Sequence, residues 1–257
     1  MKSHAAILTA VVSLAFGWGI EAANGEEWGT LKGRFVYDGE PPKEQAIPTD
    51  KEPMCAKHKV VNEELVVNRE NHGLKNVVVF VSSKKVKEHP DYKKSAGDKV
   101  TIDNNGCRFE PHIVAMTLSQ TLEIKNSDPF SHNSNLAPLG DEGINPVLTQ
   151  DATYDYKFHK IQKLPVPVAC NIHTWMKGYI VVKDNPYIAV SDADGNFELK
   201  DLPAEELEFT VWQEKAGWLV ARSDWDKKKA TFKMKIKPGD GNDLGEIKVS
   251  PKLFEKK

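Results

Sequence analysis

Short apolar runs separated by polar turns recur along most of the chain. Residues 28–37 (WGTLKGRFVY) alternate well enough for a strand, and the DGEPP that follows has the composition of a turn. Residues 76–82 (NVVVFVS) predict a buried strand. Further strand-like runs lie at 100–104, 112–118, 120–126, 152–159, 178–183, 187–203, 208–214 and 231–237. Because these runs are short, regularly spaced and accompanied by no long helical pattern, the sequence predicts an all-β protein built of sandwiches.

One of these runs shows which kind of strand to expect. In residues 231–237 (TFKMKIK), Phe232, Met234 and Ile236 share one face and lysines occupy the other. This alternation is typical of a strand with one buried and one solvated face. Residues 40–64 and 83–99 are rich in proline or charge instead, and we expect them to be a loop and a surface linker.

The beginning of the chain has the pattern of a secretory signal peptide. Lys2 provides a positive start, residues 5–20 are mostly apolar, and Glu21-Ala22-Ala23 resembles a cleavage zone. The apolar stretch is shorter than the roughly 20 residues that a spanning helix needs. We therefore expect residues 1–23 to be removed and the mature protein to be periplasmic or secreted, without stable insertion in a membrane.

Composition narrows the possible functions. Of the 257 residues, 28% are charged, and the formal net charge is −2. No basic stripe stands out from this balance, so nucleic acid is not an expected partner. No hydrolase or nucleotide-binding motif is present, and no H-x-H pair indicates a copper oxidase or reductase. The sequence predicts a protein that is not an enzyme.

The residues with the most distinctive chemistry lie in VACNIHTWMKGYIVV, residues 168–182. Cys170, His173 and Met176 have the spacing C-x2-H-x2-M just before a strand-like run. A thiolate, an imidazole and a thioether form a soft, mixed ligand set that suits copper. A blue copper site also needs a second histidine, for which His132, after the run 122–125, is the candidate. The alternative is that Cys170 and Met176 fill the core and the histidines are incidental.

Two segments in the right order resemble the cupredoxins, the blue copper protein family. FEPHIVAMTLSQTLEIKNSDPFSHN resembles the strand that leads to N-x-D and then H-N, and CNIHTWMKGYIVV resembles the ligand loop and last strand. The short C-x2-H-x2-M spacing is most similar to that of amicyanin, with longer gaps in plastocyanin. The resemblance covers about residues 100–183. It implies a Greek-key sandwich and one type 1 copper ion.

The resemblance also implies a role for each site residue. His132, Cys170 and His173 would be the trigonal ligands and Met176 the weak axial ligand. Asn133 would hydrogen-bond across to the ligand loop. His173 would be partly exposed and pass the electron, with Trp175 beside it as a docking aromatic. Pro129, Phe130 and Ile172, together with Trp175, would supply the apolar surroundings. Pro167 is expected to place the strand before Cys170 in an edge or bulged position.

The other two cysteines, Cys55 and Cys107, favour a disulfide because exported thiols oxidise readily. The alternative uses His58 and His112 nearby, which would complete a Cys₂His₂ set for a second metal ion.

A second resemblance concerns the flanking parts of the chain. YIAVSDADGNFELKDLPAEELEFTVWQE, residues 187–214, resembles the carboxypeptidase regulatory-like (transthyretin-like) module, and GTLKGRFVYDGEPP and GLKNVVVFV resemble its opening strands. In this segment, residues 192–195 (DADG) favour a tight hairpin turn over a calcium loop. The resemblance predicts a sandwich from residues 28–82 plus 187–250, with a cupredoxin domain at 97–183 inserted. The alternative is a simple tandem.

Together these features predict an exported blue copper protein that carries single electrons and meets a redox protein partner. A periplasmic copper-binding or trafficking protein is the alternative. A metal-free cupredoxin-like interaction module is a third possibility.

Overall fold

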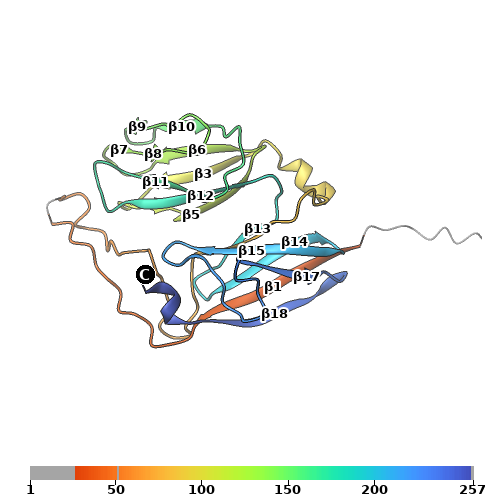
Figure 1. Ribbon diagram of the computed structural model, residues 1–257. Coiled ribbons are helices and arrows are strands. Elements are labelled where there is room, and N and C mark those ends of the chain that lie inside the picture. Colours follow the sequence, from red (N-terminus) through yellow and green to blue (C-terminus); the bar gives the residue numbers. More distant parts are fainter. Residues whose placement is uncertain (1–26, 51, 256–257) are drawn as a thin grey trace, which may run out of the picture.

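The computed structural model describes residues 27–50 and 52–255, so the expected signal peptide at 1–23 lies outside the described residues. The described chain is all-β, as the sequence predicts. Its helices are two short 3-10 turns, η1 (Pro90–Lys94) and η2 (Pro251–Phe254). Within the described part of the chain, no helix has the length and apolarity needed to cross a membrane. Figure 1 shows the strands from β3 to β12 as one body above another that contains β1, β14, β15, β17 and β18.

The first body, here called the terminal sandwich, is built from the two ends of the described chain. One sheet has the order β14-β1-β18 and the other the order β13-β2-β15-β16, with β17 also paired to β15. Apolar side chains from both sheets, such as Phe35 and Phe209, share one core. The strands are β1 (Trp28–Tyr37), β2 (Val77–Val81), β13 (Ile188–Val190), β14 (Asn196–Pro203), β15 (Glu206–Gln213), β16 (Gly217–Trp218), β17 (Thr231–Lys235) and β18 (Gly239–Val249).

The second body, here called the central sandwich, is formed by residues 99–183. Its sheets have the orders β10-β6-β3-β4 and β5-β12-β11-β8, and β7 pairs with β9. The core between them includes Cys170 and Met176, so the ligand loop is anchored in packed apolar side chains. The strands are β3 (Lys99–Asn104), β4 (Phe109–Glu110), β5 (Ile113–Thr117), β6 (Thr121–Asn126), β7 (His132–Asn133), β8 (Asn135–Leu136), β9 (Val147–Leu148), β10 (Thr153–Tyr156), β11 (Val166–Ala169) and β12 (Lys177–Lys183).

The strand before the ligand loop differs from the expectation. Pro167 was expected to place this strand in an edge or bulged position. β11 pairs with β12 in regular register, so the bulge is wrong, but β8 does not reach Pro167, which therefore does lie at an edge. Tyr179, opposite Pro167, donates its N–H to His112 on the far side of β12. The pair is therefore non-hydrogen-bonded, and β8 reaches only Val168 and Ala169. Pro167 has no N–H to donate, and at this position no neighbouring strand offers an acceptor for one.

The turn at Asp192 is tight, as expected, but the strands on either side of it do not pair with each other. The Asp192 side chain accepts the backbone N–H groups of Asp194 and Asn196. Gly195 has φ +83°, a conformation that glycine adopts without strain. This arrangement is a tight turn, which the sequence favoured over a calcium loop. The expectation of a hairpin was wrong, because β13 pairs with β2 and β14 pairs with β1, so the turn joins strands of two different sheets.

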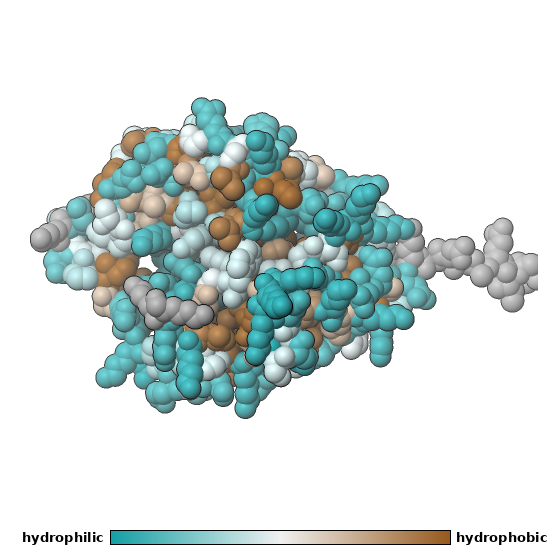
Figure 2. All heavy atoms as spheres, viewed as in Figure 1, coloured by the Kyte–Doolittle hydropathy of each residue, from teal (hydrophilic) through white to brown (hydrophobic). Residues whose placement is uncertain are grey.

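The two sandwiches pack against each other through a small apolar cluster. Val78, Phe80 and Trp212 of the terminal sandwich meet Ile113 and Val181 of the central one. On the face shown in Figure 2, apolar residues form several separate groups among hydrophilic ones. The face of β12 that carries Val181, opposite the core that contains Cys170 and Met176, is covered by the terminal sandwich.

A long loop crosses from β1 toward the central sandwich. Residues 45–50 and 52–62, here called the disulfide loop, contain no strand among those described, and Ala46 and Val61 form one isolated bridge. Cys55 is joined to Cys107 by a disulfide. Figure 1 shows this orange segment at the left of the view, beside the ends of both groups of strands.

Candidate metal centre

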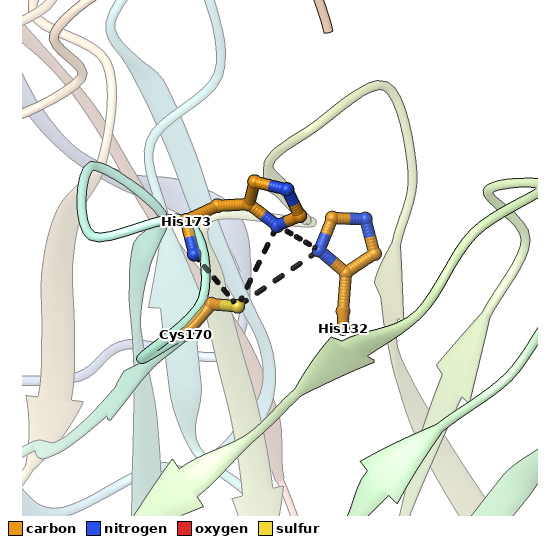
Figure 3. Close-up of side chains that lie close together, drawn as sticks. All are labelled: His132, Cys170 and His173. Atoms are coloured by element: carbon orange, nitrogen blue, oxygen red, sulfur yellow. Dashed lines mark hydrogen bonds between the residues drawn. The ribbon is translucent and has the colours of Figure 1, made fainter. Parts of the chain in front are cut away.

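Two distant segments bring three metal-ligating atoms together. His132 begins the short strand β7, Cys170 directly follows β11, and His173 lies in the loop before β12. The Nδ1 atoms of the two histidines are 2.9 Å apart, and each lies 3.9 Å from the Cys170 sulfur. Figure 3 shows the three side chains converging on one point. Among the described residues, this buried trio is the group of His, Cys, Asp and Glu side chains arranged to hold a metal ion.

The size of this triangle fits a metal ion. Its sides are 2.9, 3.9 and 3.9 Å, so the point equidistant from the three atoms lies about 2.1 Å from each. Metal–nitrogen and metal–sulfur bonds in protein zinc sites measure about 2.0–2.3 Å. Two imidazole nitrogens and one thiolate are also the trigonal donor set of blue copper sites. Both the geometry and the chemistry of the donors therefore suit copper.

His132 is oriented by a buried carboxylate. Its Nε2 lies 2.9 Å from Asp128 Oδ2, and because a carboxylate only accepts, Nε2 carries the hydrogen and Nδ1 is left with a lone pair. Burial alone would lower the pKa of His132, but the hydrogen bonds to Asp128 and Cys170 outweigh it and raise that pKa. Carboxylates that hold a ligating histidine in this way fix its tautomer and increase its basicity.

Asp128 is itself held by the backbone. Its two carboxylate oxygens accept the N–H groups of Gly106 at 2.8 Å and Cys107 at 2.9 Å. Burial raises the pKa of Asp128, but the hydrogen bonds to His132, Cys107 and Gly106 more than offset it, so the pKa is lowered. Asp128 therefore stays ionised and ties His132 to the cysteine of the disulfide.

Cys170 is a buried thiol in a tightly bonded loop. Its sulfur accepts the His173 N–H at 3.4 Å, its N–H donates to Met176 O, and Met176 N–H donates to His173 O. Burial raises the pKa of Cys170, but its interaction with His132 and hydrogen bonds from backbone N–H groups lower it below its ordinary value. Met176, at 1% exposure, is packed in the same core as Cys170. The loop thus favours the thiolate form and keeps Met176 beside it.

Asn133 connects β7 to the ligand loop. Its side-chain oxygen accepts the N–H of Asn171 at 2.8 Å and that of Ile172 at 3.2 Å, and it lies 3.4 Å from the Cys170 sulfur. Its amide nitrogen donates to Asn145. One buried side chain therefore fixes the position of the loop relative to His132.

The surroundings of the site are only partly as expected. Phe130 lies 5.0 Å from the His132 ring and 5.7 Å from the His173 ring, and Trp175 lies 5.4 Å from the His173 ring, all between centroids. Ile172 is 50% exposed and Pro129 is also exposed, so neither belongs to the apolar surroundings. That part of the prediction was wrong because both side chains are exposed to solvent.

His173 is not exposed either. It is 4% exposed, and its Nε2 lies 3.9 Å from a carboxylate oxygen of Glu52 in the disulfide loop. Burial, reinforced by the nearby His132, lowers the pKa of His173. The expectation of a partly exposed histidine was wrong because the disulfide loop, which the family resemblance does not cover, lies over this edge.

Trp175 is half-buried and is bonded to the same region. Its indole N–H donates to Cys107 O at 3.1 Å, and its ring packs with Cys55, Cys107 and Val60. A docking role for Trp175 stays a prediction. Since Cys55 and Cys107 form a disulfide, neither thiol is available for the alternative Cys₂His₂ set with His58 and His112.

Sequence reasoning assigned no role to Asp128 or Glu52. Asp128 was visible as the last residue of N-x-D, four positions before His132, and a carboxylate at that spacing is a usable signal for a brace. Glu52 carries no such signal, because its distance from His173 depends on the path of the disulfide loop.

Comparisons with known proteins identify local structural similarity. No family model and no curated protein matches this chain. A copper-containing nitrite reductase from Thermus scotoductus SA-01 aligns at 27% identity over 33% of this chain, with a TM-score of 0.30, and the chain spans 22% of that protein. A purple cupredoxin from Nitrosopumilus maritimus aligns at 19% identity over 33% of this chain and 99% of its own, with a TM-score of 0.28.

A copper(I) form of an amicyanin mutant aligns at 16% identity over 41% of this chain and 98% of its own, with a TM-score of 0.31. TM-scores this low carry no functional conclusion. The chemistry of the centre therefore rests on its own residues.

Proposed function

We propose that this protein binds one copper ion in a type 1 site and carries single electrons. His132, Cys170 and His173 hold the ion, and Met176 is the weak axial ligand. Copper supplies the one-electron couple between its two oxidation states, with a potential tuned by the axial ligand and the apolar surroundings of the thiolate. The protein's own part is to hold four side chains in one arrangement.

The observation that carries the proposal is the approach of the two imidazoles. The Nδ1 atoms of His132 and His173 face each other at 2.9 Å beside the Cys170 sulfur, while Nε2 of His132 is committed to Asp128. Nδ1 of His132 is an acceptor, so a hydrogen on Nδ1 of His173 or a cation shared by both rings must lie between the two nitrogens. A cation bound there would also take the thiolate as a ligand.

The surrounding bonds make this arrangement rigid. Asp128 fixes the His132 ring, and Asn133 fixes the loop that carries Cys170 and His173. Ligands held in place by such partners need little rearrangement when the charge of the site changes. This is the property that an electron carrier requires and that a catalyst with an open coordination position does not.

The remaining parts of the proposal concern the whole protein. Residues 97–183 form a cupredoxin domain inserted in a transthyretin-like sandwich of residues 28–82 plus 187–250. The protein is exported to the periplasm or beyond, is not an enzyme, and exchanges electrons with a redox protein. The nested arrangement is supported by the shared sheets and the shared core of residues before 82 and after 187, on either side of the central sandwich.

A copper-binding or trafficking protein without a redox partner is the second candidate. The burial of His173 under the disulfide loop favours it, because the imidazole edge offers no direct contact to a partner. A redox titration separates the two functions. A carrier cycles reversibly with copper retained, whereas a trafficking protein releases one oxidation state.

The first test is a visible absorption spectrum of the mature protein with one equivalent of copper(II). We expect an intense thiolate-to-copper band at about 600 nm, absent in Cys170→Ser and retained in Asn171→Ser, which changes an exposed neighbour in the same loop. A colourless wild-type protein would refute the type 1 site and leave the copper-trafficking protein and the metal-free interaction module, which the copper content of the desalted protein separates.

A further inference from the structure

A second histidine site lies outside the metal centre. His112, just before β5, is 5% exposed and lies between two glutamates. Its Nε2 is 2.7 Å from Glu214 Oε2, at the end of β15. Its Nδ1 is 3.7 Å from Glu63 Oε2, and this buried nitrogen has no hydrogen-bond partner. The two ring nitrogens of His112 therefore differ: Nε2 is hydrogen-bonded and Nδ1 is not.

The hydrogen-bond chemistry of the ring leaves a lone pair toward Glu63. Because the Glu214 carboxylate only accepts, Nε2 carries the hydrogen, and in the neutral ring Nδ1 is an acceptor. Glu63 presents a second acceptor, at a distance too long for a hydrogen bond even to a protonated ring. Two acceptors that face each other in a buried place are stabilised by a cation between them.

There is room for such a cation and for its water ligands. A cavity of about 380 Å³ lies against this pair and is lined by Glu63, His112, Glu214, Thr174, Trp175 and Met176 among others. Its walls come from the end of the disulfide loop, the ligand loop of the metal centre and the terminal sandwich. Both sandwiches therefore contribute residues to the walls of the cavity.

We propose that His112 Nδ1 and Glu63 bind a divalent transition-metal ion of the zinc type in this cavity, with water completing the coordination. The two atoms are 3.7 Å apart, so an ion at about 2.1 Å from each would have a nitrogen–metal–oxygen angle of about 120°. A tetrahedral site tolerates this angle. Imidazole with carboxylate is a donor pair that zinc accepts readily.

The second carboxylate acts as the brace of this site. Glu214 fixes the tautomer and the orientation of His112, and Glu214 in turn accepts the Tyr179 hydroxyl at 3.2 Å. This repeats the relationship between Asp128 and His132 at the first centre. Carboxylate-held histidines of this kind are the common support of metal ligands.

The burial of the Glu63 carboxylate also bears on the binding of a cation. Burial raises the pKa of Glu63, although His112, Arg108 and Lys75 act in the opposite direction. Arg108 pairs with Glu110 at 3.0 Å and stays 4.0 Å from Glu63. A carboxylate at 13% side-chain exposure is thus left without a close partner, and a bound cation would neutralise it.

The test counts zinc in protein that already contains one equivalent of copper. Wild type, His112→Gln, Glu63→Gln and Glu64→Gln are incubated with zinc, desalted and analysed for metal content. Glu64 lines the same cavity but faces Lys215, so Glu64→Gln is the matched control. We expect one more equivalent of zinc in wild type and Glu64→Gln than in the other two variants, and a zinc-dependent rise in Tm confined to the same pair.

The difference between variants, rather than the total, decides the proposal. If copper fails to load and zinc occupies the first centre, all four proteins gain that equivalent and the difference remains, so the two proposals fail separately. Near-UV circular dichroism shows whether each variant is folded, and Glu63→Gln serves if His112→Gln does not fold. Equal zinc content in wild type and Glu63→Gln would overturn the second site.

Discussion

The carboxylate of Asp128 lies 2.9 Å from His132 Nε2 and at the same time accepts the backbone N–H of Cys107. One side chain therefore connects a metal ligand to the disulfide. Trp175 makes a second connection, because it packs on His173 and donates to Cys107 O. The two histidines of the centre are supported from the same short segment of chain, residues 105–108.

Replacing Asp128 with Asn tests this support. An amide has one acceptor oxygen, whereas both carboxylate oxygens of Asp128 accept hydrogen bonds. At least one of these bonds is therefore lost, and the tautomer of His132 is no longer enforced. We expect copper affinity to fall by about 10–100-fold and stability by about 1.5–3 kcal/mol, measured by competition with a chelator and by denaturant unfolding.

Asp103→Asn is the control for that variant. Asp103 also accepts two bonds, both from Ser127, but does not contact His132. It should lose stability without a comparable loss of copper affinity. Equal affinity losses in both variants would show that Asp128 acts through general stability alone.

Replacing Asn133 with Ala removes the acceptor for two loop N–H groups. Each N–H left without its partner costs about 1–3 kcal/mol where it is buried, and the loop that carries Cys170 and His173 becomes free to move. We expect copper to dissociate at least about tenfold faster, measured by stopped-flow transfer to a chelator. Asn135→Ala changes a neighbouring amide with one long contact to Asn171 and should leave the rate unchanged.

Removing the disulfide should destabilise the protein and uncover His173. Cys55 and Cys107 are 52 positions apart, and closing a loop of that length in the unfolded chain is worth about 4 kcal/mol. We expect Cys55→Ala/Cys107→Ala to lose about this much in denaturant unfolding.

The same double variant reports on the cover over the metal centre. Diethyl pyrocarbonate should modify His173 in the apo variant faster than in the apo wild-type protein, because Glu52 and its neighbours are no longer tethered. His159, which is exposed in both, provides the internal reference. Unchanged protection of His173 would mean that the loop stays in place without its disulfide.

Lys183 should give stability a pH dependence of known sign. It is 8% exposed, donates to Gln162 O at 2.9 Å and lies 4.1 Å over the Phe80 ring, and burial lowers its pKa to about 8. Between about pH 8 and the unfolded value of about 10.4, the unfolded chain holds a proton that the folded protein does not. The contribution of Lys183 to stability therefore rises with pH across this window.

A comparison with Lys183→Met isolates that contribution. The free energy of unfolding of wild type minus that of the variant should rise by roughly 3 kcal/mol from pH 7.5 to pH 10.5, at 1.36 kcal/mol for each unit of pKa difference. Lys177→Met, at an exposed position of the same strand, should run parallel to wild type. Parallel curves for Lys183→Met would contradict the lowered pKa.

The sequence predicted features that depend on local pattern. The alternation of Phe232, Met234 and lysines predicted β17, and the spacing of Cys170 and His173 predicted two donors on one loop, which the structure brings together with His132. The all-β fold follows from many such short runs. These features arise from contacts between residues that are near each other in sequence.

Other features could not be predicted because they depend on distant partners. β18 (Gly239–Val249) is rich in glycine and charge and exists because β1 supplies its hydrogen bonds. The burial of His173 results from a loop more than a hundred residues away in sequence. The Glu63–His112–Glu214 site joins three segments, none of which has a metal-binding spacing of its own.

The pairing of β1 has a consequence for the order in which the chain can fold. β1 is the middle strand of its sheet, and both of its partners, β14 and β18, lie beyond residue 195. The strands of residues 99–183 pair only with one another. They can therefore fold first, while β1 still lacks its two strand partners. During synthesis, β1 thus lacks both of its strand partners until the residues from Asn196 onward have been made, and an unpaired strand edge in that interval favours aggregation.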